Sequence, residues 1–137
     1  MKILVCLDLS TQSQAVLEKG VELAKWQKAE MILFTVAEDF IDFGEGVTLA
    51  VTEQIKQQAE KSLEAAKKKA EDLGVKARAV LDFGSSPADS ILTFSEKEGV
   101  DLVVMGSRAK TGLDRFLIGS VASKVVAHSK CSVMVLR

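Results

Sequence analysis

The segment DLVVMGSRAKTGLDRFLIGSVASKVVAHSKCSVMVL, from Asp101 to Leu136, decides the fold of this chain. Four apolar residues, Leu102 to Met105, predict a buried strand that ends at Gly106. A loop with several cations follows, then a helix opening at Gly119 and a short apolar strand from Val133. Strands that are joined through a helix cannot pair as a hairpin, so the segment predicts parallel pairing with a right-handed crossover.

The same alternation of strand and helix extends back to the first residues. Apolar runs predict strands over 2–7, 31–36 and 77–83, and helical periodicity predicts helices over 13–27, 49–73 and 87–98. Thr11 or Ser13 is expected to cap the first helix and Gly74 to end the second. Ser86 with Pro87 is expected to begin the third helix and Gly99 to end it. No linker divides the chain. We therefore predict one α/β domain over 1–137, a doubly wound parallel sheet of five strands with helices on both faces.

Composition sets limits on the class of function. The chain has 137 residues, 18 basic and 19 acidic side chains and a net charge of −1, so it has no general field to attract nucleic acid or an anionic membrane. Its opening apolar run is too short for a signal peptide or a membrane span, which favours the cytoplasm. Cys6 and Cys131 are expected to be buried thiols, Trp26 to pack, and one histidine with two cysteines predicts no metal site.

A ligand is expected where the carboxyl ends of the strands meet. Gly106 and Gly119 would let backbone N–H groups approach a phosphate, and the helix that begins at Ser120 adds its dipole. Four basic side chains near these glycines supply local positive charge: Arg108, Lys110, Arg115 and Lys124. Two alternatives stay open. The two glycines could serve only turns and helix–strand packing, and Asp8 could cap the helix after it rather than face a ligand.

Several separated motifs then resemble one known family in the right order. They are ILVCLDLS (3–10), GSSPADSIL (84–92), VDLVVMGSR (100–108), HSKCSVMVLR (128–137), and the spacing G-x-x-A-x9-G-S from Gly106 to Ser120. Together they resemble the universal stress protein family. The resemblance implies a Rossmann-like fold of the adenine nucleotide alpha-hydrolase type. It also implies a dimeric sensor or regulator in the stress response that binds ATP or AMP, with any Mg²⁺ held through the phosphates.

The family's nucleotide contacts carry over by position. The resemblance implies contacts to adenosine from the first strand end and from the end of the second strand, to the ribose and phosphates from the fourth strand end and its loop, and to the phosphates from the last helix. The residues at the first strand end are Leu7, Asp8 and Leu9, and the residue at the second is Val36. Those at the fourth strand end and its loop are Met105, Gly106, Arg108 and Ala109, and those at the start of the last helix are Gly119, Ser120, Val121 and Ala122.

Ala109 is the departure from the family pattern, which has glycine there. Alanine costs on the order of 1 kcal/mol if this residue has a positive φ, and a single methyl is tolerated if φ is negative. Members that lack the glycines do not bind ATP. The alternative function is therefore a dimeric interaction module with a degenerate pocket that binds no nucleotide.

Two further expectations concern catalysis and assembly. No nucleophile with a base and an orienting group is evident and no H-x-G-H pair exists, so a nucleotidyl transferase is disfavoured and at most slow ATP hydrolysis is expected. The resemblance implies a homodimer through antiparallel pairing of the last strand, Val133, Met134, Val135 and Leu136. The alternative is a monomer whose edge is blunted by Arg137.

Overall fold

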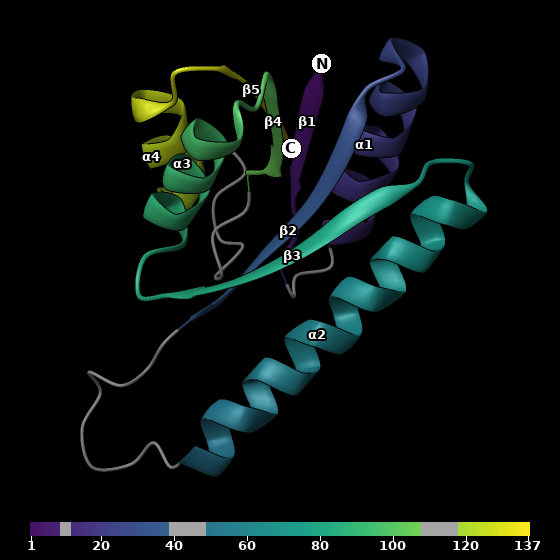
Figure 1. Cartoon of the computed structure of the whole chain (residues 1–137). Helices are drawn as coiled ribbons and strands as arrows, with labels where there is room; N and C mark the ends of the chain where they lie inside the picture. Colours follow the sequence, from purple (N-terminus) through teal and green to yellow (C-terminus); the bar gives the residue numbers. More distant parts are fainter. Residues whose placement is uncertain (9–11, 39–48, 108–117) are drawn as a thin grey trace.

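A computed structural model describes residues 1–8, 12–38, 49–107 and 118–137, and there five strands alternate with four helices (Figure 1). In chain order they are β1 (Lys2–Cys6), α1 (Ser13–Gln27), β2 (Glu30–Glu38), α2 (Leu49–Asp72), β3 (Ala77–Gly84), α3 (Pro87–Glu98), β4 (Leu102–Gly106), α4 (Ser120–His128) and β5 (Ser132–Leu136). Every element predicted from the sequence is present, with ends that differ by one or two residues.

The five strands form one sheet in the order β3-β2-β1-β4-β5, and every neighbouring pair is parallel. β1, the first strand in the chain, therefore lies at the centre. Helices α1 and α2 cover one face of the sheet, and α3 and α4 cover the other (Figure 1). The prediction of a doubly wound parallel sheet with helices on both faces is confirmed.

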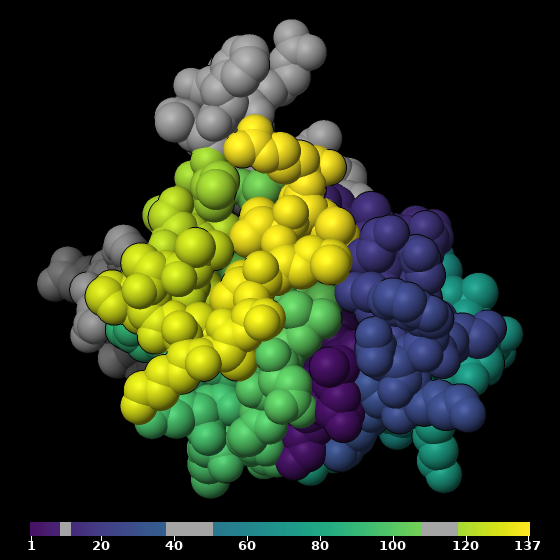
Figure 2. All heavy atoms as spheres, turned by 90° about the horizontal axis from the view of Figure 1, so that it is seen from above, coloured from purple at the N-terminus to yellow at the C-terminus, as the bar shows by residue number. Residues whose placement is uncertain are grey.

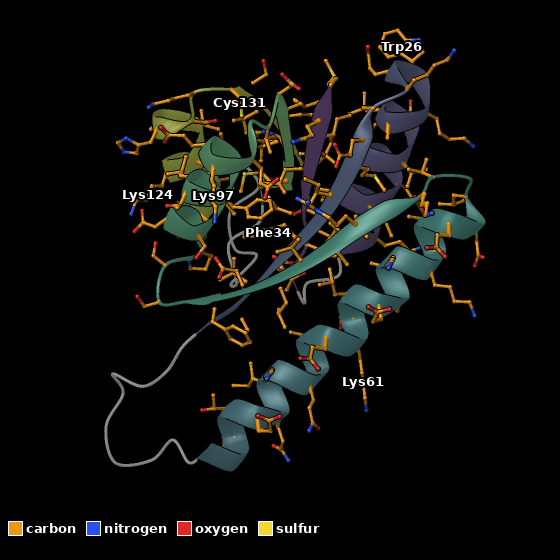
Figure 3. The ribbon with its side chains drawn as sticks, in the orientation of Figure 1. Trp26, Phe34, Lys61, Lys97, Lys124 and Cys131 are labelled. Atoms are coloured by element: carbon orange, nitrogen blue, oxygen red, sulfur yellow. The ribbon has the colours of Figure 1, made fainter. Side chains whose placement is uncertain are left out.

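Alternation along the central strands divides the core into two layers. Ile3 and Val5 pack toward α1 and α2, whereas Leu4 packs toward α3 and α4. In the second layer, the ring of Phe34 lies 4.6 Å from that of Phe94 between the sheet and α3 (Figure 3). Because the strands are buried from both sides, they read in the sequence as continuous apolar runs.

Three helix ends follow the sequence prediction. The backbone N–H of Asp89 donates to Ser86 Oγ at 3.3 Å, and Pro87 occupies the first turn of α3. Gly74 follows α2 with a φ of +97°, and Gly99 follows α3 with a φ of +67°, so both occupy the left-handed region that favours glycine.

Two local expectations are wrong. Helix α1 begins after Gln12 with no side-chain cap, and the Ser13 hydroxyl bonds Asp8 instead; Thr11 lies outside the described residues. Trp26 does not pack: 77% of it is exposed, and it projects from the end of α1 (Figure 3). Across the described residues, no helix has the length and apolar character needed to cross a membrane.

Candidate functional site

The central strand is shorter than its two neighbours at the carboxyl edge of the sheet. β2 pairs with β1 only as far as Phe34 but with β3 as far as Glu38. β4 pairs with β1 as far as Val104 but with β5 as far as Gly106. The space beyond the end of β1, between the last residues of β2 and β4, is called the notch below.

Backbone groups of two predicted residues face the notch. The N–H of Leu7 donates to the carbonyl of Phe34 at 2.9 Å, so Phe34 turns its peptide groups toward β1. Directions alternate along a strand, and Val36, two residues later, therefore turns its N–H and C=O to the same side, where no described strand pairs with it. The N–H of Ser107 donates to the carbonyl of Leu136 on β5 at 2.8 Å. By the same alternation, the peptide groups of Gly106 face the opposite side, which is the notch.

Helix α4 begins beside this space. The N–H of Gly119 donates to the carbonyl of Ser107 at 2.7 Å, which fixes the start of the helix against the end of β4. Gly119 precedes the helix and no side chain caps it. The first N–H groups of α4, on Ser120, Val121 and Ala122, are thus not bonded by a capping side chain, and the helix dipole adds partial positive charge there. This is the chemistry of an anion site.

Asp8 is held by its neighbour Ser13 at the base of the notch. The Ser13 hydroxyl lies 2.6 Å from the Asp8 carbonyl oxygen and 2.9 Å from the Asp8 carboxylate, and it accepts from the Asp8 N–H at 3.0 Å. The side chain of Asp8 is therefore not the cap of α1. It stays exposed at the end of β1, with its orientation set by Ser13.

The Gln12 side chain occupies the space next to Gly106, where any Cβ would displace it. The Gln12 amide donates to the carbonyl of Leu136 at 2.9 Å, so its side chain crosses from α1 to β5. A Cβ on Gly106 would lie 2.9 Å from the Gln12 carboxamide carbon. The packing alternative therefore accounts for Gly106 without a ligand, although the peptide group of Gly106 still faces the notch.

Of the predicted cations, Lys124 alone lies in the part of the chain that the structure describes. Lys124 lies 2.9 Å from Asp89 in an ion pair that ties α4 to α3, and the hydrogen bonds of Lys124 and then Ser86 lower the pKa of Asp89. In this conformation Lys124 reaches toward α3 rather than toward the start of α4. The predicted residues Leu9, Arg108 and Ala109, with Lys110 and Arg115, lie outside the described residues.

Sequence reasoning missed several residues around this edge. Ser107 is 7% exposed and lies between β4 and α4, and Gln12 and Ser13 form the contacts above. A cavity of about 400 Å³ also opens on the α1/α2 face, and it shares Leu7 and Asp8 with the notch. Its other lining residues are Ser13, Gln14, Leu17, Thr35, Gln58, Ser62, Ala65, Ala66 and Lys69. A hydroxyl within an apolar run, as at Thr35, was the signal available in the sequence.

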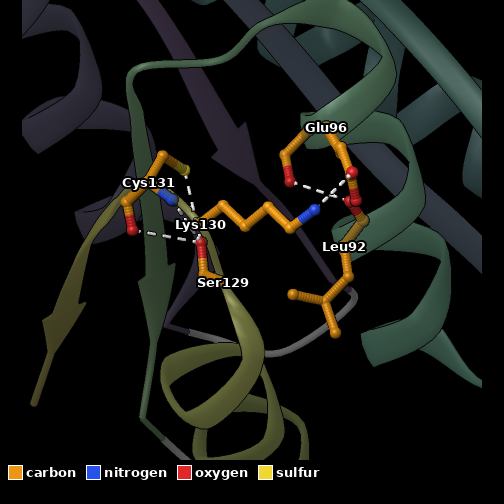
Figure 4. Close-up of polar contacts among 6 residues, drawn as sticks. Leu92, Glu96, Ser129, Lys130 and Cys131 are labelled. Atoms are coloured by element: carbon orange, nitrogen blue, oxygen red, sulfur yellow. Dashed lines mark hydrogen bonds and ion pairs between the residues drawn. The ribbon is translucent and has the colours of Figure 1, made fainter.

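The other end of the sheet is separate from the notch. There Lys130 pairs with Glu96 at 2.7 Å, and Ser129 Oγ lies 3.3 Å from Cys131 Sγ (Figure 4). Cys6 and Cys131 are both free thiols, and burial, followed by the charge of Cys131, raises the pKa of Cys6 far above its usual range. Among the described residues, no group of three His, Cys, Asp or Glu side chains could hold a metal ion.

Comparison with known proteins gives consistent matches. The model of the universal stress protein family matches residues 1–137. Universal stress protein YxiE of Bacillus subtilis is 35% identical over 99% of this chain and 98% of its own. The structure of protein MJ0577 of Methanocaldococcus jannaschii is 31% identical and superposes with a TM-score of 0.84 over 98% of this chain and 94% of that one. A universal stress protein from Archaeoglobus fulgidus in complex with dAMP, 23% identical, shares the fold with a TM-score of 0.74 over 100% of this chain and 98% of its own.

Proposed function

This chain belongs to the universal stress protein family, and from that premise we propose that it binds an adenine nucleotide, ATP or AMP, in the notch. The observation that carries the proposal is the early end of β1. It leaves the peptide groups of Val36 and Gly106 facing one space beside the start of α4. A related protein that forms a complex with dAMP supports the choice of nucleotide.

Each group around the notch suits a different part of the nucleotide. The N–H and C=O of Val36 offer one donor and one acceptor, as the edge of an adenine ring requires. The first N–H groups of α4 suit the phosphates, and Ser120 adds a hydroxyl donor. Asp8, oriented by Ser13, offers a carboxylate to the ribose hydroxyls. Any Mg²⁺ is held through the phosphates, and we assign no catalytic residue, so hydrolysis is slow at most.

We propose a homodimer through β5, in which nucleotide binding serves a sensor or regulator in the cytoplasm. β5 is an edge strand that pairs with β4 alone. It lies on the surface beside α4 (Figure 2). Since Leu136 accepts from Ser107, which directly follows β4, Val133 and Val135 turn their peptide groups outward. An antiparallel copy of β5 would satisfy those groups and cover an apolar edge.

Calorimetric titration with ATP, AMP and GTP tests the nucleotide site. The adenine nucleotides should bind and GTP should bind more weakly. Gly119→Val should abolish binding, because the side chain enters the buried start of α4 beside Ser107. Ser120→Ala should weaken ATP, and Ser123→Ala is the matched control in the second turn, where the hydroxyl bonds Ile118. Equal affinity in the Gly119→Val protein would place the nucleotide elsewhere.

Two observations favour a second candidate, a dimeric interaction module without nucleotide. Gln12 lies against Gly106, and Lys124 is paired with Asp89, so part of the expected phosphate site is occupied by the chain's own side chains. This candidate predicts a folded dimer that gives no heat and no thermal shift at millimolar ATP or AMP. The titration above separates the two functions.

A further inference from the structure

The cavity between α1 and α2 has the size and lining of a binding site that is distinct from the notch. Its volume of about 400 Å³ lies within the range typical of small-molecule sites. Small residues on one face of α2 make this room, since Ser62, Ala65 and Ala66 stand where larger side chains would reach the sheet. The cavity lies on the α1/α2 face of the sheet, and α4 lies on the opposite face.

Thr35 marks the buried end of this cavity. It directly precedes Val36 on β2 and is only 5% exposed. Because side chains alternate along a strand, its side chain points to the face covered by α1 and α2. No hydrogen bond to its hydroxyl is found among the described residues. Every fully buried side-chain nitrogen or oxygen there does have a partner. The Thr35 oxygen therefore opens into the cavity, which it lines.

The remaining lining selects an uncharged ligand. The two charged groups already have partners: the Asp8 carboxylate accepts from Ser13, and Lys69 lies 3.4 Å from Glu18. The other polar groups are neutral hydroxyls and amides, which donate and accept equally. They lie at Ser13, Gln14, Thr35, Gln58 and Ser62, and the apolar wall is formed by Leu7, Leu17, Ala65 and Ala66.

We propose that this cavity is a second ligand site, for a small neutral molecule with an apolar body and a hydroxyl or amide group at the end that meets Thr35. The apolar body lies between Leu7 and Leu17 on one side and the small residues of α2 on the other. The hydroxyl or amide group completes the hydrogen bonding of Thr35. A nucleotide's phosphates are not required, and the cavity meets the notch at Leu7 and Asp8.

Benzamide, a neutral amide on an aromatic ring, is the probe. Binding to the ¹⁵N-labelled full chain is followed by NMR, with benzoate as the anionic, benzamidine as the cationic and toluene as the apolar comparison. We expect benzamide to shift the amide resonances of Leu7, Thr35 and Ser62 and to bind more tightly than the other three. Thr35→Val removes the hydroxyl at constant shape and should weaken benzamide about tenfold, the effect of one lost hydrogen bond. Thr35→Ser keeps the hydroxyl and is the matched control.

Several results would overturn the proposal. The first is the absence of shifts at these three residues, and the second is unchanged affinity in Thr35→Val. Tighter binding of benzamidine or benzoate would mean that Asp8 or Lys69 governs the cavity. Displacement of benzamide by millimolar ATP would make the cavity part of the nucleotide site. If ATP does not bind at all, the benzamide titration still tests the cavity. A failure of the nucleotide proposal can therefore be distinguished from a failure of the cavity proposal.

Discussion

At the scale of single residues, the hydrogen bond from Gly119 to Ser107 organises the candidate nucleotide site. It joins the end of β4 to the start of α4 across residues 108–117. The two ends of the predicted G-x-x-A-x9-G-S spacing are thereby held together independently of the residues between them. The proposed phosphate binding depends on backbone N–H groups, which Ser120 and Val121 supply whatever their side chains.

Thr35 gives the first prediction at this scale. Thr35→Val should leave the free energy of unfolding unchanged or raise it by up to about 1 kcal/mol, because the hydroxyl has no described partner to lose and a methyl group of the same shape needs none. Urea denaturation measures the change. Thr35→Ser keeps the hydroxyl and loses the methyl, so it should lower stability. A destabilised Thr35→Val protein would show that the hydroxyl has a partner in the folded chain.

The role of a single residue could be predicted from the sequence only where it depends on the conformation of its own turn. Gly74 and Ser86 act within their own turns, and the sequence alone indicated both. Gln12 acts on Leu136, 124 residues away, and Thr35 acts on a cavity formed with α2. Such roles arise from contacts that only the folded chain brings together. Ser107 belongs to the same group, since its partner Gly119 lies beyond residues 108–117 in the chain.

At the scale of elements, α1 and β1 meet at a glycine. An added Cβ at Gly20 would lie 2.5 Å from Val5 Cγ2, so the helix can approach the central strand only because that side chain is missing. Gly20→Ala should lower the free energy of unfolding by about 1–2 kcal/mol, since overpacking outweighs the better helix propensity of alanine. The cost should shrink in a Val5→Ala background. An additive double variant would contradict the contact.

The α3–α4 contact predicts a dependence on pH. The hydrogen bonds of Lys124 and Ser86 lower the pKa of Asp89, so the folded state binds this proton more weakly than the unfolded state. Asp89 therefore stabilises the fold above its unfolded pKa, and that contribution is lost as pH falls through its lower folded pKa. Asp89→Asn should lower Tm slightly at pH 7 and have little effect well below pH 4. The effect is small because both partners are exposed.

Thermal melts across this pH range measure the difference. Lys124→Gln should reproduce the loss at pH 7. Glu96→Gln removes the comparable surface pair with Lys130 and shows what an exposed ion pair contributes away from α4. A difference between Asp89→Asn and the parent that persists unchanged at acid pH would exclude charge as its cause.

Elements were predicted well because their signals are local and redundant. Apolar runs marked the strands, and glycines or a Ser-Pro pair marked helix ends at Gly74, Gly99 and Ser86. The predicted cap of α1 was wrong although its first residue was right, because Ser13 bonds Asp8 across the turn instead of capping the helix. The folded geometry decides whether the Ser13 hydroxyl accepts from a helix N–H or donates to Asp8.

At the scale of the whole molecule, the proposed dimer makes a specific prediction about β5. Val135→Pro should produce a folded monomer, because it removes an outward N–H that a partner strand would use and leaves the ladder to β4 intact. Sedimentation velocity gives the oligomeric state, and circular dichroism confirms folding. Val135→Ala keeps the N–H and should remain dimeric. A dimeric proline variant would place the interface elsewhere.

The parallel sheet and its two helical layers followed from the order of elements, because helical connections exclude hairpins. The notch did not. It depends on β2 continuing to Glu38 after β1 has stopped at Cys6, and strand ends are set by pairing rather than by composition. The resemblance to a family located the edge, and the register of the strands gave its geometry.

The central place of β1 also bears on how the chain folds during synthesis. β1 leaves the ribosome before the other four strands of the described sheet, but one of its two neighbours is β4, and Lys2 bonds both Asp101 and the carbonyl of Glu98. Nearly a hundred residues of chain must therefore be made before the middle of the sheet can close. A nascent chain that stops short of β4 keeps an apolar strand with an open edge, a surface that chaperones and aggregates recognise.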